Sequence, residues 1–232
     1  MLKVAIMQPT YLPWLGYFAL MHSVDKFVLL DTVQFSRRSW QQRNQIKTAN
    51  GELMLTIPVI SKGKRDQLIR DTKIDMERDF IENHIKAIIF NYKKAKYFKS
   101  YSDQIFDIML LKHESLFLLT SELINLFKGF LSINTELIFA SQFENVGVKD
   151  ELLANLSGQV GASKFISPPG SKNYIENSKF FDGKNISIDY LKFTHPSYCQ
   201  LYEPFLPNMS IIDLIFNCGP ESLLIIENGL NN

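Results

Sequence analysis

The densest group of polar side chains in this sequence follows a predicted strand near the amino terminus, at residues 31–46. Three arginines and a tryptophan stand among several amides there. Guanidinium groups match phosphate and carboxylate oxygens, and an indole ring offers a face for stacking. A purely structural alternative, with the tryptophan in the core and the arginines in solvent, leaves the amides unexplained. We therefore predict a binding site that includes Asp31, Gln34, Arg37, Arg38, Trp40, Arg43 and Asn44.

A second set of candidates lies earlier, in the loop that follows the first apolar run. This loop contains two prolines and a glycine, a composition typical of a turn that cradles a ligand after a strand. Amide side chains such as those of Gln8 and Asn44 could orient carbonyl oxygens. The candidates for substrate binding in this loop are Gln8, Tyr11, Trp14, Gly16 and Tyr17.

His195 is the histidine best placed for acid–base chemistry, because it directly follows a predicted strand at residues 186–193. Two interpretations stay open: His195 faces the site, or the proline after it fixes a turn that leaves it outside. Tyr198 and Gln200 are further candidates for substrate binding, and Asp31 is a second candidate base. No metal site is expected. Structural roles are favoured for the other histidines, His22, His84 and His113.

Common catalytic and nucleotide-binding loops are absent from the sequence. There is no G-x-S-x-G, Walker A or G-x-G-x-x-G pattern. The basic loop at residues 61–66, Ser-Lys-Gly-Lys-Arg-Asp, could contact a phosphate. A solvated surface loop is the favoured interpretation, because a short basic run is a weak signal.

The elements that position these side chains begin with one βαβ unit. Apolar runs at residues 4–7 and 27–30 predict two strands, and residues 17–24 between them are long enough for two turns of helix. Such a unit places the polar residues after each strand at the same edge of a parallel sheet. We therefore expect both candidate sets to lie at the carboxyl ends of the first two strands.

The rest of the chain predicts a mostly parallel sheet covered by helices. Residues 76–133 carry apolar side chains at three- and four-residue spacing, which indicates three helices. A strand at 137–139 and a helix at 149–160 follow, and a last helix begins after Ser210, a good N-cap. The expected fold is one α/β domain over residues 1–232, Rossmann-like, with a helical insertion at 76–133.

Composition limits the classes of partner. The formal net charge is +1, which argues against a protein that coats nucleic acid. The two cysteines, Cys199 and Cys218, form no metal or redox motif and indicate reduced thiols. There is no recognisable signal peptide, and no apolar tract approaches the ~20 residues needed to span a bilayer. We expect a cytoplasmic protein that does not engage a membrane, of unassigned oligomeric state.

Several motifs together resemble the WbqC-like family of bacterial proteins. The resemblance is carried first by Gln8-Pro9-x-Tyr11-x-Pro13-Trp14-x-Gly16-Tyr17-Phe18, Asp31-x-Val33-Gln34-Phe35 and Trp40-Gln41-x-Arg43-Asn44. It continues at residues 92–98, 167–174, 195–200 and 205–219. This resemblance implies an association with surface-polysaccharide (O-antigen, lipopolysaccharide) gene clusters and a glycine transferase role. The opening segment is also similar to HIGH-type nucleotidyltransferases such as pantothenate synthetase, with Trp14 and Tyr17 where those enzymes have their two signature histidines.

These observations favour an acyl or aminoacyl transferase or ligase that forms an amide on a nucleotide-linked amino sugar, with glycine as donor. The alternative is a non-catalytic protein that binds a sugar nucleotide. The cofactor is unassigned, and ATP or an acyl or aminoacyl carrier would supply activation. We expect His195 and Tyr198 to reach the site from its opposite wall. One concave surface should be lined by Gln8, Tyr11, Trp14, Asp31, Gln34, Arg37 and Arg43.

Overall fold

A five-stranded parallel sheet forms the centre of the structure, a computed structural model that describes residues 1–231 apart from the side chain of Tyr174. The strand order is β5-β2-β1-β6-β7, and every neighbouring pair is parallel. The expected pairing of the first two strands and the Rossmann-like α/β fold are confirmed. The strands are β1 Lys3–Met7, β2 Lys26–Leu29, β5 Glu136–Phe139, β6 Lys164–Ser167 and β7 Ser187–Tyr190.

The order of the strands reverses direction at β1. From β1 the chain adds β2 and β5 on one side, and it then crosses to add β6 and β7 on the other. In open α/β sheets such a switch point leaves a crevice at the carboxyl ends of the two strands that flank it. The topology therefore places a candidate crevice between the ends of β1 and β6.

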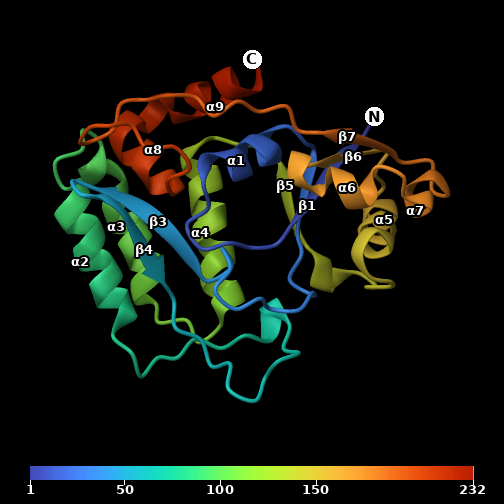
Figure 1. The fold of residues 1–232 in the computed structure, drawn as a ribbon, viewed down its shortest axis with the longest axis horizontal. Helices are drawn as coiled ribbons and strands as arrows, with labels where there is room; N and C mark the ends of the chain where they lie inside the picture. The colour runs from blue at the N-terminus through green and yellow to red at the C-terminus, as the bar shows by residue number, and fades with distance from the viewer. Residues whose placement is uncertain (232) are drawn as a thin grey trace.

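Both faces of the sheet are covered, because its strands are apolar on both sides. Val4 and Ile6 pack with helix α5 (Lys149–Gln159), whereas Ala5 between them packs on the opposite face. That opposite face is covered by α1 (Leu15–His22), α4 (Leu116–Phe130) and α9 (Ser222–Leu230), and α5 lies on the other side (Figure 1). The short elements are α6 Lys172–Ile175, α7 Lys179–Asp182, η1 Ile69–Asp71, η2 Ala140–Gln142, η3 Pro169–Ser171 and η4 Gly219–Glu221.

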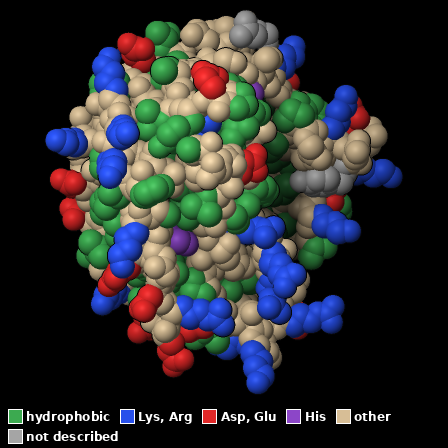
Figure 2. Space-filling view, turned by 60° about the vertical axis from the view of Figure 1, so that its left-hand side comes forward, with side chains coloured by type: hydrophobic (Ala, Val, Ile, Leu, Met, Phe, Trp, Pro, Cys, Tyr) green, Lys and Arg blue, Asp and Glu red, His purple; other side chains and the backbone are tan. Residues whose placement is uncertain are grey.

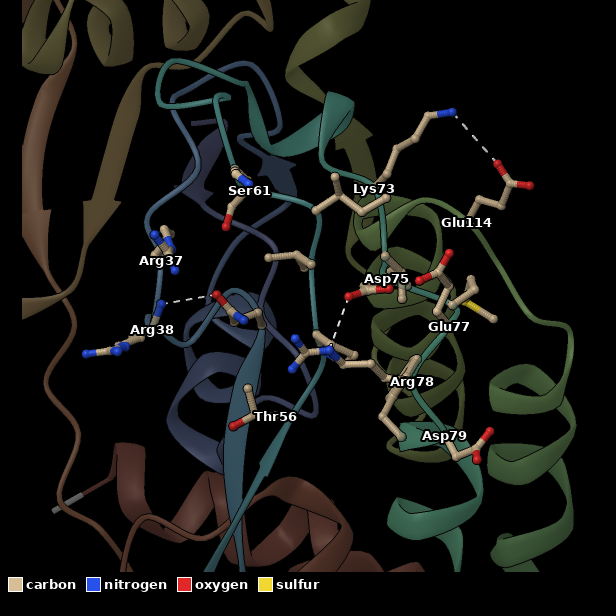
Figure 3. A pocket seen from close by; sticks show the side chains of 18 of the residues that line it. Arg37, Arg38, Thr56, Ser61, Lys73, Asp75, Glu77, Arg78, Asp79 and Glu114 are labelled. Carbon is tan, nitrogen blue, oxygen red and sulfur yellow. Dashed lines mark hydrogen bonds and ion pairs between the residues drawn. The ribbon is translucent and has the colours of Figure 1, made fainter.

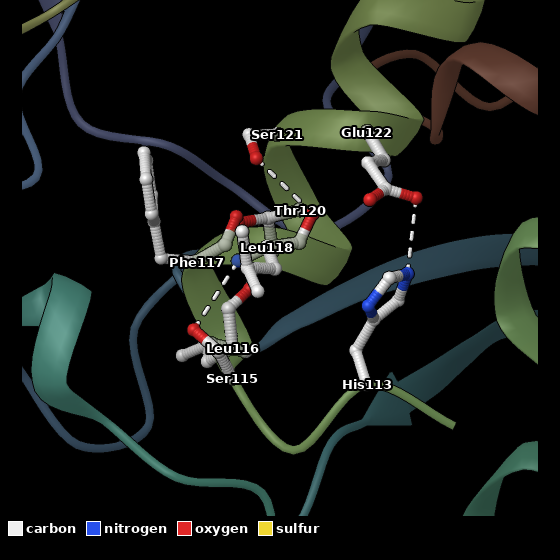
Figure 4. Close-up of polar contacts among 8 residues, drawn as sticks. All are labelled: His113, Ser115, Leu116, Phe117, Leu118, Thr120, Ser121 and Glu122. Carbon is white, nitrogen blue, oxygen red and sulfur yellow. Dashed lines mark hydrogen bonds and ion pairs between the residues drawn. The ribbon is translucent and has the colours of Figure 1, made fainter. Parts of the chain in front are cut away.

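Three helices occupy the segment 76–133, as its apolar spacing predicted. They are α2 (Phe80–Tyr92), α3 (Phe98–Leu110) and α4. Helix α4 starts at an N-cap serine, Ser115, whose hydroxyl accepts a hydrogen bond of 3.3 Å from the backbone N–H of Leu118 (Figure 4). His113, just before this cap, lies 3.0 Å from a carboxylate oxygen of Glu122 in the next turns of the same helix.

An antiparallel hairpin separates the opening unit from these helices. Strands β3 (Arg43–Thr48) and β4 (Gly51–Thr56) form their own two-stranded sheet, joined by a tight turn at residues 49–50. Arg43 and Asn44 therefore belong to a strand, although the sequence analysis had placed them in the polar segment that precedes it.

The carboxyl-terminal part of the chain consists of a long irregular segment followed by helices α8 (Ile211–Cys218) and α9. After β7 the chain runs without regular structure from residue 191 to 209 and enters α8, whose N-cap serine, Ser210, accepts a hydrogen bond from the Ile212 N–H. Strand β7 is shorter than the strand expected at 186–193. Within residues 1–231, no helix combines the length and apolar character needed to cross a bilayer.

Candidate functional site

A cavity of about 630 Å³ opens at the switch point of the sheet. Its walls come from the ends of β1 and β6, from the chain after β2, from residues 39–41 and from the start of α5. The size is in the range of small-molecule sites. The lining residues that carry polar side chains are Gln8, Thr10, Ser39, Trp40, Gln41, Lys149, Ser167 and Ser171.

Gln8 is held in this cavity by a second amide. Gln41, which is nearly fully buried, donates from Nε2 to the side-chain oxygen of Gln8 over 2.8 Å. The oxygen of Gln41 in turn accepts from the backbone N–H of Ser36 at 2.9 Å. Because the hydrogen bond from Gln41 occupies the Gln8 side-chain oxygen, the Gln8 NH₂ group is left as a free donor, without a hydrogen-bond partner among the described residues. The loop after β1 thus presents an oriented N–H donor to a ligand carbonyl or oxyanion.

Trp40 supplies an exposed aromatic wall. Its side chain is 52% exposed although it lines the cavity, and its backbone oxygen accepts a 3.0 Å hydrogen bond from the N–H of Tyr11. Such an indole can stack on a nucleobase or a sugar ring. The exposure shows that Trp40 is not part of the core, and its contact with a ligand stays a prediction.

The β6 wall is built from small hydroxyl residues. The hydroxyl oxygens of Ser167 and Ser171 lie 2.6 Å apart, and Ser171 also donates to the carbonyl of Pro168 at 2.7 Å. A Cβ added to Gly170 beside them would meet no heavy atom within 4 Å, so the backbone there is open to a ligand. Lys149 is the one charged residue among the described residues that line the cavity. The cavity can therefore bind mainly through neutral hydrogen bonds and stacking.

The arginines expected beside Gln8 line other hollows. Arg37 and Arg38 lie at a larger cleft of about 1190 Å³, across from Asp75, Glu77 and Asp79 (Figure 3). Arg38 donates its backbone N–H to the Gln42 side-chain oxygen at 3.1 Å, which turns the loop away from the switch point. Gln34 joins Arg37 at a smaller hollow of about 330 Å³. None of these residues is among those that line the cavity of Gln8, contrary to the expected single surface.

Tyr11 and its neighbours have supporting roles. The Tyr11 side chain is 0% exposed, and its hydroxyl lies 2.9 Å from Nδ1 of His84 on α2. Burial raises the pKa of Tyr11 and lowers the pKa of His84 to about 4, so both groups are neutral near pH 7. Asn44 is also buried and donates to the carbonyl oxygens of Tyr11 and Leu12 at 3.2 and 2.7 Å. Tyr11 and Asn44 therefore shape the loop after β1 and do not face a ligand.

Gly16 and Tyr17 make structural contacts, and Arg43 is not among the residues that line the cavity of Gln8. A Cβ on Gly16 would lie 2.2 Å from the ring of Trp14, so glycine is needed for this close approach. The buried Tyr17 donates from its hydroxyl to the backbone oxygen of Gln8 at 3.3 Å. Arg43 starts β3 and has a buried Nε without a partner among the described residues.

His195 lies with Trp14, away from the residues that line the cavity of Gln8. The two rings stack with 6.1 Å between centroids and 13° between planes. Nδ1 of His195 lies 2.9 Å from the carbonyl of Pro196, and Nε2 accepts from the backbone N–H of Asn208 at 3.0 Å. Burial lowers the pKa of His195. Since both ring nitrogens are occupied by backbone groups, the ring fixes residues 191–209 and has no free lone pair for a base.

Tyr198 and Gln200 also help to fix residues 191–209 in place. The Tyr198 hydroxyl and the Gln200 amide both donate to one oxygen of Asp213, at 2.8 and 2.7 Å. Burial raises the pKa of Asp213, and Tyr92 donates to its other oxygen at 2.9 Å. Lys47 donates to the Gln200 side-chain oxygen at 2.8 Å. Every group here has a protein partner, which indicates a structural network rather than a substrate contact.

Asp31 lies directly after Leu30, which lines the cavity, but it is fully buried itself. One carboxylate oxygen accepts from the backbone N–H of Ser141 at 2.9 Å. The other oxygen is buried without a partner among the described residues. Asp31 therefore holds the chain after β2 against η2, and it does not line the cavity as expected. No group of three or more His, Cys, Asp or Glu side chains in residues 1–231 is placed to hold a metal ion.

The sequence interpretation did not single out most of the cavity. Thr10, Gln41, Lys149 and the β6 wall were not among the predicted site residues. The sequence contains a signal for the β6 wall, because Ser167 is followed by Pro-Pro-Gly-Ser, which is typical of a turn, and turns after parallel strands lie at the ligand-binding edge of a sheet. Gln41 belongs to the polar segment and to one of the family motifs but was not chosen as a site residue, and Lys149 carries no signal in the sequence, because its side chain reaches the cavity through tertiary packing.

Comparison with known proteins places the chain in a family. A model of the WbqC-like protein family matches residues 8–225. The chain is 38% identical over 224 residues to the uncharacterized protein Rv1507c of Mycobacterium tuberculosis, which covers 96% of each chain. No solved structure matches significantly, and the similarity to HIGH-type nucleotidyltransferases finds no support here. From the extent of the family match and of this relative, the chain belongs to the WbqC-like protein family.

Proposed function

We propose that this protein is an acyl or aminoacyl transferase or ligase that forms an amide on a nucleotide-linked amino sugar, with a glycyl group as the preferred donor. Family membership suggests a role in polysaccharide-related biosynthesis. The observation that carries the proposal is the cavity at the switch point, where an oriented Gln8 N–H donor and an exposed Trp40 face share one space. The first group suits a carbonyl and the second suits a ring.

The chemistry needs an activated acyl group. The amine of the sugar attacks the carbonyl of a thioester or acyl phosphate, the new C–N bond forms, and the bond to sulfur or phosphate oxygen breaks. The leaving group takes the proton that the amine releases, so the atoms balance without an acidic or imidazole side chain in the cavity. In the tetrahedral stage the carbonyl oxygen becomes an oxyanion, to which Gln8 Nε2 donates. ATP or an acyl carrier supplies the activation.

The test uses purified protein with a nucleotide-linked amino sugar and two donor systems, glycine with ATP and a glycyl thioester. Mass spectrometry of the products detects the gain of one glycyl unit. We expect Gln8→Ala to slow transfer strongly, and Lys99→Gln, an exposed substitution on α3, to leave it unchanged. Absence of a glycylated product with every donor and sugar tried would refute the transferase.

A non-catalytic sugar-nucleotide binding protein is the second candidate. It is favoured by the lack of Asp, Glu, His and Cys among the described residues that line the cavity. Saturable binding of a nucleotide sugar without turnover, measured by calorimetry with the same samples, distinguishes this candidate from the transferase. Neither candidate involves nucleic acid or a membrane.

A further inference from the structure

Two basic segments that are distant in sequence meet at the small hollow beside the switch-point cavity. One is residues 34–37, after β2, and the other is residues 61–67, the teal loop at the bottom of Figure 1. The hollow has a volume of about 330 Å³. We call it the diphosphate hollow, and its lining residues are Gln34, Phe35, Ser36, Arg37, Ser61, Lys64, Arg65 and Gln67.

The charged side chains that line the diphosphate hollow are all cations, and the carboxylate of Asp66 lies next to it, 3.5 Å from Nε2 of Gln34. Arg37, Lys64 and Arg65 line it, and no carboxylate is among its lining residues. None of the three forms an ion pair with another described residue. The larger cleft next to it is different, because Arg78 pairs with Asp75 at 3.2 Å there. Figure 2 shows Lys and Arg side chains gathered at the lower right of one face of the molecule, in line with this excess.

Hydrogen bonds to backbone carbonyl groups hold the two segments together despite this like charge. The N–H of Phe35 donates to the carbonyl of Gln67 at 2.9 Å, and the Gln34 side chain donates to the carbonyl of Arg65 at 2.8 Å. The N–H of Ile69 donates to the carbonyl of Val33 at 3.0 Å. Three unpaired cations near a fixed backbone attract a multivalent anion, because the fold has already brought them together.

The diphosphate hollow is continuous in sequence with the proposed active site. Val33 lines the switch-point cavity and Gln34 lines the hollow. Arg37 lines the hollow, and Ser39, two residues later, lines the cavity again. Two residues span at most about 7 Å of backbone, so the backbone that borders the hollow lies close to the backbone that borders the cavity. Gln41 also links them, because it bonds Gln8 in the cavity and the N–H of Ser36 at the hollow.

We propose that the diphosphate hollow binds the diphosphate of the nucleotide-linked sugar, while Trp40 and Gln8 contact one end of the same molecule in the cavity. Arg37, Lys64 and Arg65 bind the phosphate oxygens. This inference rests on the proposed function for the identity of the whole ligand. The binding of a diphosphate by these three cations stands without it. The proposal gives residues 61–67 a role in recognition.

The experiment measures binding of inorganic pyrophosphate, a nucleoside diphosphate and a nucleoside by isothermal titration calorimetry at low salt. We expect pyrophosphate and the nucleoside diphosphate to bind, and the nucleoside diphosphate to bind more tightly than pyrophosphate. The nucleoside should bind weakly. The double variant Lys64→Gln/Arg65→Gln should weaken pyrophosphate binding at least about tenfold, since two of three charged partners are lost. The matched control, Lys94→Gln/Lys99→Gln, removes two exposed charges elsewhere and should bind as the parent does. Raising the salt to ~0.5 M should weaken binding in the parent more than in the double variant.

The outcomes separate the two proposals. If pyrophosphate does not bind the parent protein, or if the control variant loses as much affinity as the double variant, the diphosphate hollow is refuted whatever the enzyme assay shows. If pyrophosphate binding depends on Lys64 and Arg65 but no glycylated product forms, the hollow stands and the transferase fails. Equal unfolding midpoints for the variants exclude a loss of fold as the cause.

Discussion

Acidification should weaken the fold through His84, because this histidine is buried and neutral. It is 6% exposed, its Nδ1 lies 2.9 Å from the Tyr11 hydroxyl, and its ring meets Phe80 edge to face at 5.5 Å. Burial lowers its pKa from 6.5 to about 4. Since Tyr11 belongs to the loop that carries Gln8, the same contact ties helix α2 to the proposed active site.

The direction and size of the effect follow from proton linkage. Between pH 6.5 and about 4 the unfolded chain binds a proton at this histidine and the folded chain does not, so stability falls as pH falls through that window. Above pH 6.5 the contribution is fully present. A pKa shift of this size lowers the free energy of unfolding by about 3 kcal/mol in the limit of low pH. About 2.5 kcal/mol of that stability is lost by pH 4.5.

Urea unfolding at pH 7 and pH 4.5 measures this loss. Carboxylates also titrate in this range, so the comparison is with His84→Gln, which cannot titrate there and keeps an acceptor for Tyr11. We expect the parent protein to lose about 2 kcal/mol more than His84→Gln over the same pH change. Tyr11→Phe, which lacks the hydrogen bond but keeps the buried ring, should show the parent's pH dependence from a lower starting stability.

Equal losses for the parent and His84→Gln between these two pH values would refute the reasoning. That result would mean that the unfolded and folded chains bind protons at His84 with similar affinity, and hence that the ring is hydrated in solution.

Four further predictions concern substitutions at single positions. Gly16→Ala places a Cβ 2.2 Å from the Trp14 ring and should cost about 1–3 kcal/mol in urea unfolding, with a changed near-ultraviolet circular dichroism spectrum; an unchanged spectrum would contradict the contact. Ser115→Ala removes the cap of α4 and should cost about 1 kcal/mol, most of which Ser115→Asp should restore. Trp40→Ala should keep the unfolding midpoint yet weaken nucleotide-sugar binding about tenfold in calorimetry, and Gln8→Ala should lower the transfer rate about 10²–10³-fold; unaffected binding and rate would remove both residues from the site.

Local pattern was enough to determine the layers of the fold. The apolar runs that became β1 and β2 have hydrophobic side chains on both faces, a pattern of buried parallel strands, and the helix between them leaves them adjacent. The spacing in residues 76–133 predicted three helices because an amphipathic helix repeats its apolar side chains every three to four residues. The serine caps of α4 and α8 are also local, since a cap bonds an N–H two or three residues away.

The sequence also predicted a binding role for the polar segment after β2, and that role stays a prediction. It did not show that this segment divides between two hollows. Trp40 faces the switch-point cavity and Arg37 faces the diphosphate hollow, although three positions separate them, because hydrogen bonds from Ser36 and Arg38 to Gln41 and Gln42 turn the loop. The direction of a side chain in a loop depends on such bonds and not on residue type.

Tertiary structure alone decided the roles of the residues that come from distant parts of the chain. His195 follows a strand, as a base at a sheet edge would, yet its two nitrogens are occupied by Pro196 and Asn208. In the sequence, Lys64 and Arg65 belong to a segment typical of a solvated surface loop. Their proposed role in binding phosphate depends on the hydrogen bonds of Gln34 and Phe35, which hold that loop beside Arg37. The physical reason is that periodicity reports which face of an element is buried, whereas the partners of a polar group are set by contacts between segments far apart in the sequence.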